Sequence, residues 1–564
     1  MKLLGSNKRN NIRILKCAAI GLGLLTTAIL VVVLNPVQMV ADYKLTMYEG
    51  SFLYKLWQKP PLDVFIKVFM FNVTNYDRFV RGLDAKLKVE EIGPYVYQEF
   101  LEHHNATFNA NDTLSYNPLR KVKFIREQSI GDPKTDMIIS PNIPYMGVTA
   151  AASSISVFMA FAVRTLVRQF DAKIMLRISV HEYLWGYEDP LVNIASKLVP
   201  SVINFQKFGL LDRMFDEGRN LVTIKLPHKP GRKRVRKDGE VTTTVDYGDI
   251  DYEFDNFEPQ ARDFSIDNWN GLKGLKHWGY EEGAPNTACN TLQGSFDGTL
   301  FPKNMSRGDT FRVYRKAFCR TLPVIYSHPG TLDGVDAYFF KLAEYAFDTN
   351  ASDSQTACFC KDKMCLKKGL GKITPCYYNI PSAISFPHFF NADPSLFKSL
   401  EGLSPDVKKH GTEIVIQPQL GVPMRVFTRF QVNLLMGEIS FNSEMSKFKN
   451  MVLPIFWLEI GVEKLTPELI LLLQLLFNVC PYVQMGFAIL MGAAGVATIG
   501  FASLLFLCVQ KPIKPLRDID QKFELRRYSG AYLFPIIKKE ISKFADEDDA
   551  EQLQSLTEMP CEEN

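Results

Sequence analysis

Charged side chains are absent from two long stretches of this sequence. Residues 17–41 form 25 successive positions without a charge, and no charged residue lies between Glu468 and Lys511. About 20 apolar residues are enough for a helix to cross roughly 30 Å of hydrocarbon, so each stretch predicts a transmembrane helix. The apolar segment 144–162 does not predict a third, because it contains several Ser and Thr residues and runs into Arg164. We therefore expect a membrane protein in which two spans flank one large domain.

Acidic residues are absent before the first stretch, whereas five basic residues precede it. The second stretch is also followed by basic residues, so the positive-inside rule places both termini in the cytoplasm. A cleaved secretory signal is the alternative, but the apolar run is about twice the length of a signal-peptide core. We predict a cytoplasmic N-terminus at 1–16, a first span at 17–41 and an extracellular domain at 42–482. A second span at 483–509 and a cytoplasmic tail at 510–564 follow. Pro481 is expected to separate the second span from an apolar approach segment, 469–480.

Glycosylation sequons are absent from both predicted cytoplasmic segments. All five lie between the spans, at Asn72, Asn105, Asn111, Asn304 and Asn350. Because N-glycans are added on the lumenal side, this distribution supports the predicted topology.

Cysteines are scarce, and the paired CxxC motifs of structural zinc modules are absent. Six of the ten cysteines lie between residues 289 and 376, and in an oxidising lumen this even number predicts three disulfides, with 15 possible pairings. A zinc site is the alternative. Cys17 and Cys508 lie beside basic residues at the two predicted cytoplasmic boundaries and are candidate palmitoylation sites. Small residues four apart, Ala19 with Gly23 and Ala493 with Ala497, could pack the spans together or build a homo-oligomer.

Catalytic motifs are absent as well. The segment GSFDG at 294–298 has its serine in the wrong place for a nucleophile elbow, and His103, His104 and His388 have no partners at metal-ligand spacing. We expect no enzyme activity, no metal and no cofactor. A net charge of +4 also gives no reason to expect nucleic acid as a partner. The basic run at 228–237 is either a solvated hairpin tip or a patch for anionic surfaces.

Secondary-structure patterns predict a mixed α+β domain. Residues 64–73 and 86–99 are rich in β-branched and aromatic side chains and predict strands, with Gly93-Pro94 as a turn. The segment 148–170 and the segment that begins at Pro190 predict helices. Short strands and turns are expected from Leu221 to Ile460.

Six motifs resemble the successive signatures of the class B scavenger receptor family, which includes a fatty-acid translocase, a high-density-lipoprotein receptor, a lysosomal integral membrane protein and insect sensory neuron membrane proteins. They occur in the family's order between the two spans: EIGPYVY at 91–97, EYLWGYEDP at 182–190, CFC at 358–360, ISFPHF at 384–389, RFQVNLL at 429–435 and LPIFWL at 453–458.

The resemblance implies an antiparallel β-barrel-like core, a helical apex over about residues 150–208 and an apolar tunnel through the ectodomain. By position, 150–170 and 191–208 match the apex helices. The resemblance also implies a pairing for the cysteines of region 289–376. The implied pairs are Cys289–Cys358, Cys319–Cys376 and Cys360–Cys365.

The implied function is capture of lipid or lipoprotein ligands at the apex and passage of fatty acids, sterols or carotenoids through the tunnel to the membrane. Basic apex residues that would attract such ligands are Arg164, Arg168, Lys173 and Arg177, although Gln169 and Asp171 stand where the fatty-acid translocase has lysines. The alternative is a receptor or co-receptor that acts by contact alone. The tail contains no YxxΦ or acidic-dileucine sorting signal, which favours the plasma membrane over endosomes or lysosomes.

Overall fold

The computed structural model describes residues 2–155, 157–170, 172–198, 200–201, 203–215, 218–227, 262–349, 354–360, 365–439 and 444–510. Several features singled out above lie outside these ranges: the basic run at 228–237, Asp171, Asn350 and the tail from Lys511 onward.

Two long apolar helices lie near the two ends of the described chain. Helix α1 (Lys2–Leu34) contains the apolar segment Asn11–Leu34, and the second apolar segment is Pro467–Cys508. Asn35 adopts a left-handed backbone with φ of 46°, and helix α2 (Pro36–Lys44) begins at the proline that follows. The first predicted span, 17–41, is therefore interrupted at this point, because proline has no N–H to continue the hydrogen bonds of α1.

Helix α1 packs against α13 (Cys480–Gln510) through glycine. A side-chain carbon on Gly21 would lie 2.9 Å from the carbonyl oxygen of Gly495, and one on Gly495 would lie 2.8 Å from Leu25. Small residues allow helices to approach this closely. The contact uses Gly21 rather than the expected Gly23, where an added side-chain carbon would meet no other residue within 4 Å.

Pro481 does not divide the second apolar helix. Helix α12 (Pro467–Gln474) passes through a π-helical turn, Leu475–Val479, directly into α13. The wider π-turn accommodates the proline ring without ending the helix. A break was expected between 469–480 and 483–509, but the helix is continuous there and only locally widened.

The rest of the described chain is built around a large antiparallel sheet. Neighbouring strands along it are, in order, β10 (Thr310–Arg315), β11 (Arg320–Leu332), β12 (Val335–Leu342), β16 (Glu413–Gln417), β17 (Val422–Leu435), β18 (Val452–Val462), β1 (Val64–Val73), β2 (Leu87–Phe108), β3 (Thr113–Phe124), β8 (Val222–Lys225) and β9 (Ile266–Trp269). Shorter strands pair at its side: β13 (Gly371–Lys372), β14 (Ser382–Ser385) and β15 (Leu400–Glu401), the last parallel to β2.

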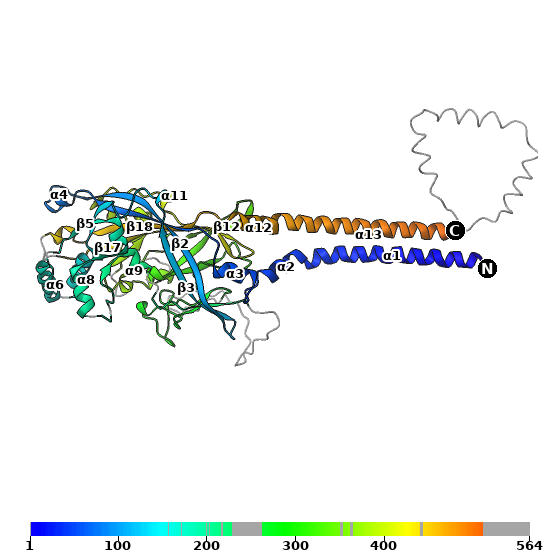
Figure 1. Ribbon diagram of the computed structural model, residues 1–564, viewed down its shortest axis with the longest axis horizontal. Coiled ribbons are helices and arrows are strands. Elements are labelled where there is room, and N and C mark those ends of the chain that lie inside the picture. Colours follow the sequence, from blue (N-terminus) through cyan, green and yellow to red (C-terminus); the bar gives the residue numbers. More distant parts are fainter. Residues whose placement is uncertain are drawn as a thin grey trace, which may run out of the picture. The chain divides into compact units, whose positions relative to one another are not determined.

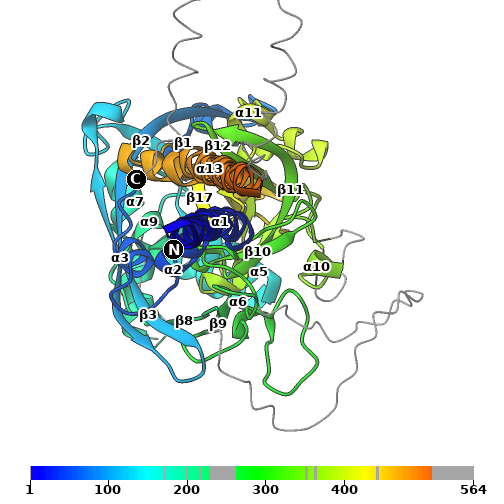
Figure 2. The ribbon, with the colours of Figure 1, turned by 90° about the vertical axis from the view of Figure 1, so that its right-hand side faces the viewer.

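Residues 294–296 join the two ends of this sheet. On one side the N–H of Ile266 in β9 donates to the carbonyl of Ser295 at 2.7 Å, and on the other the N–H of Phe296 donates to the carbonyl of Arg312 in β10 at 2.8 Å. The sheet therefore closes into a barrel, and Figure 2 shows the strands following one another from β9 through β1 to β10. The GSFDG segment is the closing piece of this barrel. Its Ser295 is buried and donates its hydroxyl to the carbonyl of Leu292.

A group of helices lies at one end of the barrel, and α2, α3 (Phe52–Gln58) and α12 lie at the other (Figure 1). The group contains α5 (Ile143–Ile155), α6 (Val157–Gln169), α7 (Val180–Trp185), α8 (Pro190–Leu198) and α9 (Leu210–Met214), with the strand pair β4 (Met137–Pro141) and β5 (Met175–Ser179). The expected helix over 191–208 is wrong beyond Leu198. Pro200 opposes its continuation, and the segment ends in strand β7 (Lys207–Phe208).

Strand β1 has the predicted bounds, but the predicted turn at Gly93-Pro94 is wrong. Strand β2 continues through it, and the register against β1 shifts by one residue between Val68 and Met70. A side-chain carbon on Gly93 would lie 2.7 Å from the carbonyl oxygen of Val68, so glycine permits the close approach of the two strands. The Gly-Pro signal marks a β-bulge here rather than a chain reversal.

Candidate functional site

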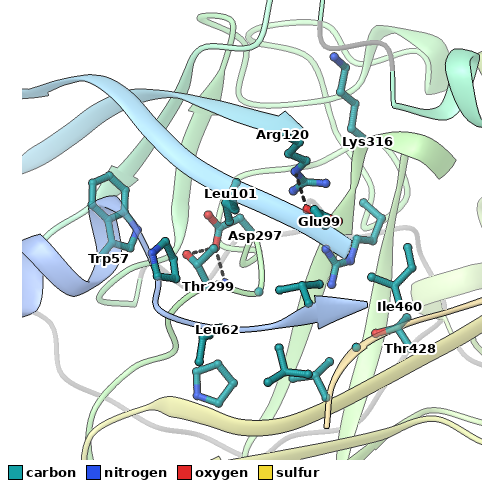
Figure 3. A pocket seen from close by; sticks show the side chains of 18 of the residues that line it. Trp57, Leu62, Glu99, Leu101, Arg120, Asp297, Thr299, Lys316, Thr428 and Ile460 are labelled. Atoms are coloured by element: carbon teal, nitrogen blue, oxygen red, sulfur yellow. Dashed lines mark hydrogen bonds and ion pairs between the residues drawn. The ribbon is translucent and has the colours of Figure 1, made fainter. Parts of the chain in front are cut away.

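The barrel encloses a cavity of about 260 Å³, which we call the barrel cavity (Figure 3). Most of its wall is apolar and comes from elements far apart in the sequence. Its apolar residues include Leu53 and Trp57 of α3, Leu62, Leu101, Met214, Phe318, Phe430, Ile460 and Leu469. Such a space, lined by hydrocarbon side chains with a few polar groups, is suited to an apolar ligand.

A second cavity of about 50 Å³, which we call the second cavity, shares the lining residues Met214 and Phe318 with the first. The strand register gives the order of the two cavities along the barrel. The barrel cavity reaches Val462, which pairs with Val64 at the start of β1, whereas the second reaches Val432 and Ile143 at the start of α5. The two cavities therefore follow one another from the α3 end towards the helical end, and Met214 and Phe318 line both of them.

Five charged side chains interrupt the apolar wall of the barrel cavity: Glu99, Arg120, Asp297, Arg315 and Lys316. Nε of Arg120 lies 3.5 Å from the carboxylate of Glu99, and Asp297 accepts from the hydroxyl and the N–H of Thr299 (Figure 3). Asp297 also accepts a short hydrogen bond from the hydroxyl of Tyr116. Sequence patterns gave no signal for this cluster, because its members come from β2, β3, β10, the turn after β10 and the closing segment.

An aromatic stack supports the wall where α3 meets the barrel. His103 stacks on Trp57 with ring centres 4.2 Å apart, and its Nδ1 lies 2.7 Å from the carbonyl oxygen of Trp57. Burial lowers the pKa of His103 to about 4, so the ring is neutral at physiological pH. Its place in this stack gives His103 a structural role.

Four of the six sequence motifs meet in a second place, outside the cavity. The carboxylate of Glu91 accepts hydrogen bonds from Nε2 of His388 at 2.5 Å and from Nε1 of Trp457 at 2.7 Å. The backbone N–H of His388 donates to the side chain of Gln431, and the His388 ring stacks on His410. Burial alone would raise the pKa of Glu91, but the two hydrogen bonds outweigh it and lower that pKa. These motifs therefore fix how strands β1, β2, β17 and β18 pack.

Residues 19–506 match the sequence model of the CD36 family. The chain belongs to the CD36 family. Among its relatives are Scavenger receptor class B member 1 of Cricetulus griseus, 28% identical over 411 residues that cover 73% of this chain and 72% of the relative, and Lysosome membrane protein 2 of Homo sapiens, 28% identical over 446 residues that cover 78% and 84%. The resemblance drawn from the motifs is confirmed, and the protein is a membrane receptor of the class B scavenger receptor type. Its relatives in this family are named as receptors and membrane proteins rather than as enzymes.

The predicted apex residues of this family member lie at the helical end of the barrel but in different settings. Arg164 and Arg168 are one turn apart on α6, where Arg168 is exposed and Arg164 is half-buried with an Nε that has no hydrogen-bond partner. Lys173 is exposed after α6, and Arg177 is exposed on β5. On the same end, Phe158 and Phe161 of α6 are 79% and 63% exposed. The sequence analysis did not single out these aromatic residues.

The predicted glycosylation sites also differ in setting. Asn105, Asn111 and Asn304 are exposed. Asn72 is half-buried on β1, a strand that is paired on both sides, and its side-chain oxygen accepts a hydrogen bond from the N–H of Ile139 at 2.8 Å. A glycan on the folded domain has free access to the three exposed asparagines, whereas Asn72 would first have to break this contact.

Two of the three implied disulfides are present, Cys289–Cys358 and Cys360–Cys365. The third implied pair is in its reduced form in this structure. Cys319 and Cys376 are free thiols in hydrogen-bond contact, and burial, followed by the interaction with Cys319, raises the pKa of Cys376. The candidate palmitoylation sites are both free thiols, with Cys17 half-buried and Cys508 exposed. In the described ranges, no group of three or more His, Cys, Asp or Glu residues could hold a metal ion.

Proposed function

We propose that this protein is a cell-surface receptor that takes lipid from a particle or carrier protein and passes it through the barrel to the membrane. The observation that carries the proposal is the succession of two apolar cavities that share Met214 and Phe318, and we propose that they join into one apolar path with a neck at these two residues. Each buried CH₂ group is worth about 0.8 kcal/mol, so a long-chain lipid crosses an aqueous gap slowly unless it is shielded. The path supplies that shield, and no covalent step is needed.

The two ends of the path fit the two roles of such a receptor. The helical end presents Arg164, Arg168 and exposed phenylalanines, which suit the surface of an anionic lipid particle. At the other end the chain leaves the barrel from Val64 and Val462, which are paired, and continues into the apolar helices. The plasma membrane is the proposed location, with both termini in the cytoplasm, because the tail has no lysosomal sorting motif.

Lipids that copurify with the full-length protein test this function directly. We expect mass spectrometry of an organic extract to find a fatty acid, sterol, sterol ester or carotenoid enriched over an extract of the detergent micelles alone. The expected amount is close to one lipid for each protein molecule, because the neck at Met214 and Phe318 slows exchange. A protein that is consistently empty would contradict the proposal.

Charge reversal at the helical end tests the capture of lipid particles separately from lipid transfer. We expect R164E/R168E to bind phosphatidylserine vesicles about tenfold or more weakly, because each basic residue near an anionic surface contributes about 1 kcal/mol. K408E/K409E is the matched control, since both lysines are exposed on α11 (Val407–His410). Unchanged vesicle binding by R164E/R168E at normal surface expression would exclude α6 as the capture site.

A contact receptor without lipid transfer is the second candidate, favoured by the exposed Phe158, Phe161 and Leu198. Exposed apolar groups of this kind often mark protein interfaces. The two candidates predict different results for a receptor whose apolar path is blocked: transfer would stop, whereas recognition by contact would continue.

A further inference from the structure

The barrel cavity contains a guanidinium group that donates no hydrogen bond to any residue in the described ranges. Arg315 is the last residue of β10 and lines the cavity, where its side chain is half-buried. None of the hydrogen bonds and ion pairs that join described residues involves this guanidinium, although arginine carries five N–H donors. Polar groups enclosed by protein nearly always have hydrogen-bond partners, so these donors are available to a molecule inside the cavity.

Gly298 leaves this group uncovered. It adopts a left-handed backbone with φ of 92°, and a side-chain carbon at this position would lie 3.4 Å from Nη2 of Arg315. The closing segment of the barrel therefore passes Arg315 without placing a side chain over it.

The nearby carboxylates are already occupied. Glu99 is paired with Arg120, and Asp297 accepts hydrogen bonds from Tyr116 and Thr299. Burial, followed by the charge of Arg120, lowers the pKa of Arg315, and Glu99 and Asp297 counteract both from a distance. Nε of Arg120 also lacks a hydrogen bond despite its ion pair with Glu99. Arg315 and Nε of Arg120 thus have hydrogen-bond donors that the described residues do not use.

We propose that Arg315, supported by Arg120, binds the anionic head group of an amphiphilic lipid inside the barrel cavity, while the lipid's chain lies along the apolar wall. This subsite deepens the proposed function and rests on it. Guanidinium groups bind carboxylate and phosphate through paired, charge-assisted hydrogen bonds. The subsite selects lipids with an acidic head over neutral esters and hydrocarbons of equal length.

The test compares three probes with one chain length on full-length protein in phosphatidylcholine nanodiscs, after subtraction of empty nanodiscs. Palmitate carries a carboxylate, hexadecyl phosphate a phosphate and hexadecanol no charge. We expect R315M to bind at least one acidic probe about tenfold more weakly and hexadecanol within about twofold of the original protein. Selective loss of palmitate identifies a fatty acid as the source of the head group, and selective loss of hexadecyl phosphate identifies a phospholipid.

A second variant keeps the test informative if R315M folds poorly. E99Q removes the acid that occupies Arg120 and should strengthen binding of the acidic probe severalfold. Equal losses for acidic and neutral probes in R315M, or unchanged acidic-probe binding in both variants, would overturn the subsite. Failure of the original protein to bind any of the three probes would instead reject the proposed function itself.

Discussion

Replacing Met214 with tryptophan is expected to reduce lipid delivery to the level of cells that lack the receptor. Met214 lies in α9, lines both the barrel cavity and the second cavity at the proposed neck, and is almost fully buried. The indole is larger than the methionine side chain and would fill the narrowest part of the path. Protein interiors are packed so closely that a filled neck leaves no route for a chain of methylene groups.

The readout is uptake of a labelled lipid from vesicles, measured together with vesicle binding at the cell surface. Binding should remain, because α6 lies away from the neck. M137W is the matched control: Met137 lies on β4 with 49% exposure, so the same substitution there leaves the path open. Overpacking costs about 1–3 kcal/mol, which thermal unfolding of both variants would measure. Normal uptake by a well-folded M214W receptor would show that lipid does not travel through the barrel.

Loss of the Cys289–Cys358 disulfide is expected to be the most destabilising change at the cysteines. This bond joins residues 69 apart, whereas Cys360–Cys365 closes a separation of five. In the chain-entropy account, removal of the long crosslink costs about 4 kcal/mol and removal of the short one about 2 kcal/mol. Few domains exceed roughly 15 kcal/mol of total stability, so the first loss should strongly reduce surface expression.

Denaturant unfolding of C289A/C358A and C360A/C365A measures both costs on purified protein. A larger cost for the short loop would contradict this ranking. Peptide mapping without reduction tests a third crosslink in the same samples. We propose that Cys319 and Cys376 form a disulfide in the oxidising lumen, because their thiols are already in contact. Recovery of only free Cys319 peptides would exclude it.

The first apolar helix and the first strand could be predicted because each is encoded by one continuous pattern in the sequence. Absence of charge over residues 17–41 predicted an apolar helix, and β-branched residues over 64–73 predicted strand β1 with its observed bounds. Predictions from local sequence signals were wrong where tertiary contacts determine the conformation of the segment. Gly93-Pro94 is a turn signal, but its place between β1 and β2 makes it a bulge. The helix expected to run to Phe208 ends at Leu198, where Pro200 outweighs the apolar pattern.

The interior of the barrel could not be predicted from the residues. Glu99 and Arg315 are 216 positions apart, and no spacing rule connects strands that meet only after the sheet has closed. The family resemblance implied a tunnel but named none of the charged residues in its wall. It also drew attention to motifs such as ISFPHF, whose His388 contacts Glu91 and supports strand packing rather than the cavity.

The pairing of Val64 with Val462 also has a consequence for how the protein is made. These two residues are 398 positions apart, so β1 emerges from the ribosome long before its partner β18. Contacts between such distant segments form late in folding. The pairing of β1 with β18 forms only after almost the whole domain has been synthesised. The second apolar helix follows β18 directly in the sequence. A chain that terminates before β18 keeps an unpaired β1 edge, which is a target for chaperones in the secretory pathway.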